Sequence, residues 1–223
     1  MQGNYIKTGN TAQGLFNYAA MPGYQEQEYQ LVWALPEALR DKVRKCRFAF
    51  HEKYPHPFGM PMQVVLPLVK FRQRLLLEER VRHSIFQLAS GWRPFQITLK
   101  NFASVPSHSI YIPVASRAGS SSSEGLHRVN KDLKSIQTVL KLDKEHAPFF
   151  FNDLKLIVAS RLPSAIFDAA WKEYAHRSFS AQFIADACLL IKRSPGEVNW
   201  KIVQRFELRD LPVGVTQQSL FVA

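Results

Sequence analysis

Residues 151–193 decide the fold, and they read FNDLKLIVASRLPSAIFDAAWKEYAHRSFSAQFIADACLLIKR. An apolar run at 154–158, broken only by a lysine, is long enough for a buried strand. Pro163 suits the first turn of a helix, and apolar residues then recur at helical spacing. Two further strands are predicted at 179–185 and 187–192, and the single residue between them leaves open a tight bend or one long bent strand. The predicted order is strand, helix, strand, strand.

The rest of the chain alternates elements of the same kinds. Strand segments are recognised by apolar alternation and helices by an apolar stripe with basic residues on the remaining face. The strands at 95–102 and 109–114 are expected to pair with each other. We expect further strands at 28–35, 60–69 and 198–208, and helices at 36–54, 72–91 and 126–142.

Changes in composition suggest how these elements are divided. A Gly-, Asn- and Gln-rich start without periodicity is typical of a loose arm, and the run RAGSSSSEG is the best boundary between two lobes. We expect a loose arm at 1–27, a first lobe at 28–116, a linker at 117–125, a second lobe at 126–209 and a tail at 210–223.

Overall composition limits the class of protein. The chain has 223 residues, is 46% hydrophobic and carries a net charge of +11, so it can bury a core and favours anionic partners. There is no apolar run long enough to span a membrane and no signal pattern at the start. Cys46 and Cys188 lack metal-like spacing. We therefore expect a cytoplasmic protein with reduced thiols, no metal and no cofactor, whose oligomeric state the sequence leaves open.

Two short motifs accompany the order of elements in the opening stretch. Ala159-Ser160-Arg161-Leu162 leaves the first strand, and Leu189-Leu190-Ile191-Lys192-Arg193 forms a late strand. With these motifs the chain resembles the 2H phosphoesterase superfamily, the family of 2′-5′ RNA ligase-like proteins and cyclic phosphodiesterases. The resemblance implies an α+β, two-lobed 2H phosphoesterase-like fold, with antiparallel sheets and flanking helices around a central cleft.

The chemistry of that family depends on a His-x-Thr or His-x-Ser motif in each lobe. The two imidazoles act as general base and general acid on a phosphodiester, because imidazole titrates near neutral pH. At the matching positions this chain has Met62 and Val64, and Lys155 and Ile157. Met, Val and Ile have no proton to transfer, so the resemblance predicts the fold with degenerate motifs and no catalytic residues at these positions.

Other residues remain candidates for binding a ligand. Lys155 can hold a phosphate as a point charge, and His56, His108 and Arg161 lie near the two motif segments in the sequence. The leading hypothesis is an inactive relative that binds RNA, a nucleotide or another phosphorylated ligand in the cleft. The alternatives are an active cyclic phosphodiesterase or RNA ligase-like enzyme that uses displaced residues, and a structural or partner-binding protein with a vestigial cleft.

Overall fold

Strands and helices alternate along the computed structural model, which describes residue 21 and residues 23–60, 63–115 and 121–212. The expected arm and tail lie mostly outside these ranges. In chain order the elements are β1 Glu26–Trp33, α1 Glu37–Lys53, β2 Pro67–Arg74, the 3₁₀ helix η2 Leu75–Leu77, α2 Glu78–Ser90, β3 Phe95–Lys100, β4 Ala103–Val105, β5 Ser109–Pro113, α3 Ser121–Ser135, α4 Gln137–Leu140, β6 Phe149–Phe150, β7 Lys155–Ser160, α5 Ser164–Tyr174, β8 Ser180–Ala185, β9 Ala187–Arg193 and β10 Lys201–Glu207.

The strands form antiparallel sheets that draw on both halves of the chain. A five-stranded sheet has the order β10-β9-β1-β2-β6, while β3 pairs with β8, and β4, β5 and β7 form a third group. A single bridge between Leu99 and Val114 links β3 to the segment after β5. The sheets therefore do not coincide with the sequence lobes 28–116 and 126–209, and the expected pairing of 95–102 with 109–114 is reduced to that bridge.

The chain passes from one sheet to another at Asp186. β8 pairs with β3, whereas β9 pairs with both β1 and β10, so the two strands do not form a hairpin with each other. The carbonyl of Asp186 accepts a hydrogen bond of 2.8 Å from the amide of Leu208, which follows β10. The break between the two apolar runs is therefore a crossing between sheets.

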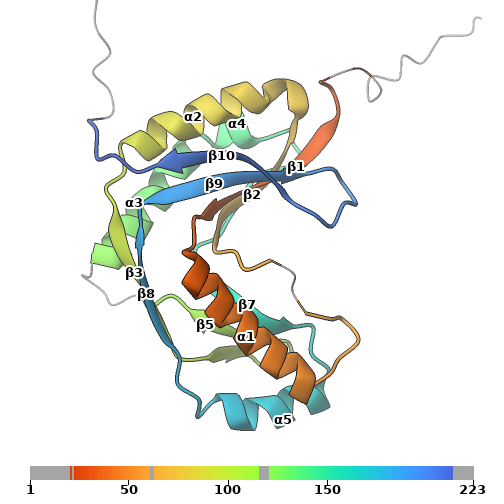
Figure 1. The fold of residues 1–223 in the computed structure, drawn as a ribbon. Coiled ribbons are helices and arrows are strands. Elements are labelled where there is room, and N and C mark those ends of the chain that lie inside the picture. The colour runs from red at the N-terminus through yellow and green to blue at the C-terminus, as the bar shows by residue number, and fades with distance from the viewer. Residues whose placement is uncertain (1–20, 22, 61–62, 116–120, 213–223) are drawn as a thin grey trace, which may run out of the picture.

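The helices cover the sheets as their apolar stripes predict. In Figure 1, α2 and α4 lie above the five-stranded sheet, whereas α1 and α5 lie below it with β5 and β7. α1 packs on β7 and α3 packs on β3. One buried cluster includes Leu31 of β1, Ile97 of β3 and Leu156 of β7, so both parts of the molecule share a core.

Two boundaries differ from the sequence prediction for reasons of tertiary contact. The helix expected from Arg72 begins only at Glu78, because β2 continues to Arg74 in register with β1. Gln73 is 2% exposed, and its amide donates to the carbonyl of Val139 at 3.0 Å, so a polar residue is satisfied within this strand. The strand expected at 60–69 correspondingly begins later, at Pro67.

The low-complexity run also differs, since the part from Ser121 to Gly125 forms the first turns of α3. A Cβ on Gly125 would lie 2.7 Å from the ring of Phe95. Glycine allows the helix to approach β3 closely here, because an added Cβ would force the Phe95 ring to move. The expected linker at 117–125 is therefore helical over the residues that the structure describes beyond 120.

Candidate phosphate-binding cavity

A cavity of about 290 Å³ lies between β7 and the segment that leads into β2. The strands expected at the two motif positions therefore face one site, as the resemblance predicts. Its walls are mainly apolar, with two cationic side chains and one carboxylate. The lining residues are Arg47, Gln63, Val65, Pro67, Phe151, Asp153, Lys155, Ile157 and Ser160.

A bulge in β7 determines which of its residues reach the cavity. Ile157 pairs with Tyr111 and Ala159 pairs with Ile110, so Val158 is the extra residue. Val158 and Ala159 are both 1% exposed, and Ser160 joins Ile157 in the cavity wall. Simple alternation would have turned Ser160 to the opposite face of the strand. The bulge therefore adds a hydroxyl to this wall.

The opposite wall is an extended segment whose side chains alternate without a regular ladder. The carbonyl of Leu66 accepts a hydrogen bond of 3.0 Å from the amide of Trp33, which holds the segment against β1. Val64 and Leu66 are 7% and 0% exposed, while Gln63 and Val65 line the cavity. The two faces of the segment are thereby fixed, one in the core and one in the site.

This alternation changes the register of the first motif. Val64, expected in the cleft, belongs to the hydrophobic core, and Met62 lies outside the described residues. Gln63 and Val65 occupy the cavity wall instead. In β7 the predicted positions Lys155 and Ile157 do line the cavity. Gln63 and Val65 from the first segment thus face Lys155 and Ile157 from β7 across the cavity.

Arg47 connects the two walls. Its Nε donates to the carbonyl of Ile157 and its Nη1 donates to the carbonyl of Gln63, each at 2.8 Å. The residue is 3% exposed, and burial, with a smaller contribution from the charge of Arg44, lowers the pKa of its guanidinium from 12.5 to about 10. It remains charged at neutral pH, so the protein places a cation in the wall of a largely apolar cavity.

Lys155 supplies the second cation. Its Nζ lies 4.6 Å from the centre of the Tyr111 ring, a distance at which an ammonium is attracted to the ring face. Asp153, two residues earlier, also lines the cavity and offsets one of the two positive charges. Arg47 and Lys155 together still leave a positive excess among the lining residues.

The other predicted ligand residues lie elsewhere. Arg161 follows β7 with a φ of 55°, and its guanidinium lies 5.7 Å from the ring centre of Phe58. His108, in the turn between β4 and β5, is exposed, and its carbonyl accepts from the amide of Leu162. Both residues are therefore at the C-terminal end of β7, whereas Lys155 is at its N-terminal end. Neither of them lines the cavity.

His56 pairs with another histidine away from the cavity. It is 8% exposed, and its ring centre lies 5.5 Å from that of His51. Both Nδ1 atoms are buried without a hydrogen-bond partner among the described residues. Burial, and then the proximity of His51, lower the pKa of His56. The two imidazoles are close together, but neither lines the cavity between the motif segments.

The sequence pattern did not single out Arg47, because the basic residues of the helix expected at 36–54 were placed on the face that remains beside its apolar stripe. A signal was present, since Leu39, Val43 and Phe50 are buried on α1 and Arg47 falls on the same stripe. A charged residue on an apolar stripe indicates a buried charge with specific partners. Gln63 and Val65 were missed because only the neighbouring β1 determines which face of their segment is buried.

The described residues also limit what else the site could be. No group of three or more His, Cys, Asp or Glu side chains among them could hold a metal ion. None of the helices in the described ranges is long and apolar enough to cross a bilayer. The architecture is α+β, with antiparallel sheets and flanking helices.

Solved structures confirm this fold class. Escherichia coli LigT complexed with 3′-AMP superposes with a TM-score of 0.52 at 13% identity, over 82% of this chain and 98% of that chain. The protein TT0787 of Thermus thermophilus gives 0.51 at 16% identity, over 82% and 98%. A structure described as a phosphoesterase gives 0.52 at 14% identity, over 82% and 99%.

Comparisons of the sequence alone do not assign the chain to a family. No protein-family model matches the chain, and no curated protein matches it significantly. At identities of 13–16% the structural similarity shows the fold, and one fold can support several activities. The function must therefore be argued from the cavity itself.

Proposed function

We propose that the protein binds a nucleotide, RNA or another phosphorylated ligand in the cavity between β7 and the segment before β2, and does not hydrolyse phosphodiesters there. The single observation that carries the proposal is the composition of the wall. Arg47 and Lys155 line the cavity together, and none of its described lining residues is a histidine.

The two cations suit a phosphate in different ways. Arg47 is held by carbonyls on both walls, so its guanidinium is already in place before a ligand binds. Lys155 lies at the Tyr111 ring and can turn its ammonium toward an anion. Val65, Phe151 and other apolar side chains in the same wall offer a surface for a flat or apolar part of the ligand.

Two further points favour a binding protein over the alternatives. The cavity is open, and Val64, which would have helped to fill a vestigial cleft, lies in the core. Acid–base catalysis of phosphodiester cleavage by two imidazoles would need histidines in the wall, and each such group typically contributes about 10²- to 10⁴-fold. E. coli LigT, which has the same fold, was crystallised with 3′-AMP, so a nucleotide is a reasonable first ligand.

The test is a calorimetric titration of the protein with 3′-AMP, repeated with Lys155→Ala. We expect binding to wild type and a Kd roughly tenfold or more weaker for the variant, because a hydrogen bond to a charged group contributes about 1.5–3 kcal/mol. Lys172→Ala on α5, which removes an exposed lysine that does not line the cavity, is the matched control. Equal affinity of Lys155→Ala and wild type for 3′-AMP would show that the ligand does not bind in this cavity, and it would overturn the proposal.

Catalysis is tested separately with 2′,3′-cyclic nucleotides. We expect no hydrolysis above the buffer rate. Robust turnover that is abolished by His56→Gln or His108→Gln would instead show that the chemistry uses displaced residues, and it would overturn the proposal.

A further inference from the structure

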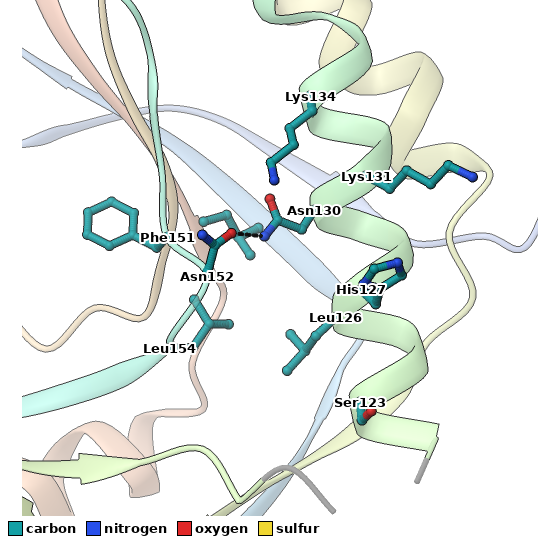
Figure 2. A pocket seen from close by; sticks show the side chains of 10 residues that line it. Ser123, Leu126, His127, Asn130, Lys131, Lys134, Phe151, Asn152 and Leu154 are labelled. Atoms are coloured by element: carbon teal, nitrogen blue, oxygen red, sulfur yellow. Dashed lines mark hydrogen bonds between the residues drawn. The ribbon is translucent and has the colours of Figure 1, made fainter. Parts of the chain in front are cut away.

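A second and larger cavity lies between α3 and the segment that joins β6 to β7. It has a volume of about 600 Å³, and Figure 2 shows α3 on one side and residues 151–154 on the other. Its floor is apolar and its rim is polar and basic. The lining residues are Leu68, Ser123, Leu126, His127, Asn130, Lys131, Lys134, Phe151, Asn152 and Leu154.

The charge of this cavity is one-sided. Lys131 and Lys134 both line it, and its lining includes no Asp or Glu. Neither lysine makes an ion pair with another residue in the described ranges. Lys134 reaches over Asn130 in Figure 2, on the side of the helix that faces Asn152. The cavity therefore presents an uncompensated ammonium at its rim.

An amide pair holds the two sides together. The Nδ2 of Asn130 donates to the Oδ1 of Asn152 at 2.8 Å. With its oxygen engaged, Asn152 directs its own NH₂ group away from the helix, and this group donates to no other residue in the described ranges. The Lys134 ammonium beside this amide pair suits a ligand that is rich in acceptors, such as a phosphate joined to a sugar or base.

A third, smaller cavity has lining residues in common with both of the others. A cavity of about 240 Å³ shares Asn152 and Leu154 with the α3 cavity, and it shares Asp153 and Lys155 with the cavity of the proposed function. Tyr111, the ring on which Lys155 rests, also lines it. Phe151 lines both larger cavities directly. The three cavities are therefore neighbours along residues 151–155, between Lys155 and Lys134, and the rings of Tyr111 and Phe151 belong to their linings.

We propose that the α3 cavity is a second phosphate subsite, which holds the next part of a single-stranded nucleic acid whose first phosphate is bound at Arg47 and Lys155. This inference rests on the proposed function. Proteins bind single strands with cations that pair with phosphates and with aromatic rings on which bases stack, and these neighbouring cavities hold both kinds of side chain. Lys134 is the phosphate-binding residue of the subsite.

The experiment measures how affinity depends on ligand length. Wild type, Lys134→Ala, Lys155→Ala and the control Lys172→Ala are titrated with AMP and with a fluorescently labelled single-stranded RNA hexamer, at several salt concentrations. Lys134 and Lys172 are both exposed lysines on helices, so each variant loses one charge without disturbing the core.

The inference predicts a selective loss. Lys134→Ala binds AMP as wild type does but binds the hexamer roughly tenfold more weakly. The slope of log affinity against log salt for the hexamer falls by about 0.7, the value for one phosphate contact on a single strand. Lys172→Ala changes neither property.

Two other results separate the possible failures. If Lys134→Ala matches Lys172→Ala on the hexamer while Lys155→Ala weakens both ligands, the α3 subsite is overturned and the proposed function stands. If Lys155→Ala weakens neither ligand, the proposed function fails, and the second subsite, which rests on it, fails as well.

Discussion

Replacing Arg47 with Met separates the role of this residue in binding from its role in the fold. Arg47 is 3% exposed, and the fall of its pKa from 12.5 to about 10 corresponds to roughly 3 kcal/mol of unfavourable free energy for the charged form. Because the folded pKa of this base is lowered, the penalty is fully present below about pH 10. Methionine relieves it.

The hydrogen bonds of Arg47 act in the opposite direction. Its removal leaves the carbonyls of Gln63 and Ile157 without these donors, at about 1–3 kcal/mol each. The two effects nearly offset each other, so we expect the free energy of unfolding to change by about −1 to +3 kcal/mol relative to wild type, where positive values mean destabilisation.

The effect of Arg47→Met on ligand affinity, unlike its effect on stability, is not offset by a second contribution. Loss of the guanidinium removes a charged hydrogen bond to the phosphate, which contributes about 1.5–3 kcal/mol, so the Kd for 3′-AMP should rise by roughly 10- to 150-fold. Urea denaturation gives the stability and calorimetry gives the affinity. Lys45→Met, an exposed lysine on the same helix, is the control for charge and residue type. A loss of more than about 5 kcal/mol in stability together with unchanged affinity would refute the reasoning and make Arg47 purely structural.

Three further changes test the packing and titration of the fold. Burial alone would raise the pKa of Glu28, but the hydrogen bond from Arg193 and neighbouring charges lower it overall. In urea denaturation at pH 7, Glu28→Gln should therefore be about 1–3 kcal/mol less stable than wild type. This difference should shrink as the pH falls below 4.5, because wild-type Glu28 then becomes protonated. Gly125→Ala should lower the melting temperature, although alanine favours helices, because its Cβ would lie 2.7 Å from the Phe95 ring; an increase would mean that the ring yields freely. The lowered pKa of His56 means that the folded state disfavours its protonated form, so the stability of wild type should fall as the pH drops below 6.5. The stability of His56→Gln, measured by urea denaturation, should fall less. Equal slopes of stability against pH for the two proteins would contradict the lowered pKa.

Local patterns predicted most elements of this fold. α1 and α5 follow from a proline before an apolar stripe of helical period, and β9 follows from an apolar run. The strand at Arg72–Arg74 could not be recognised locally, because its state is decided by pairing with β1. The partner of β3 is β8, which is far away in the sequence, and no local signal identifies it.

The candidate site was also predictable only in part, because local patterns in the sequence do not show which face of a segment is buried by distant strands. Lys155 and Ile157, which were expected in the cleft, both line the cavity, and β7, which carries them, has a clear apolar pattern. In the segment before β2, apolar residues occur on both faces, so the sequence pattern does not show which face is buried. The prediction was therefore off by one residue: Val64, expected in the cleft, is buried, and Gln63 and Val65 line the cavity. The buried charge of Arg47 was visible in the sequence only as a cation on an apolar stripe.

The central claim is that the cavity binds a phosphorylated ligand without cleaving it, and one phosphorus NMR measurement on 2′,3′-cyclic AMP mixed with the protein tests both halves. The account predicts that the cyclic phosphate resonance shifts or broadens on addition of wild type, recovers with Lys155→Ala, and gives no phosphomonoester resonance beyond the buffer control. A monoester resonance that grows with protein concentration would contradict the absence of catalysis. A cyclic phosphate resonance that is unchanged by wild type would contradict binding.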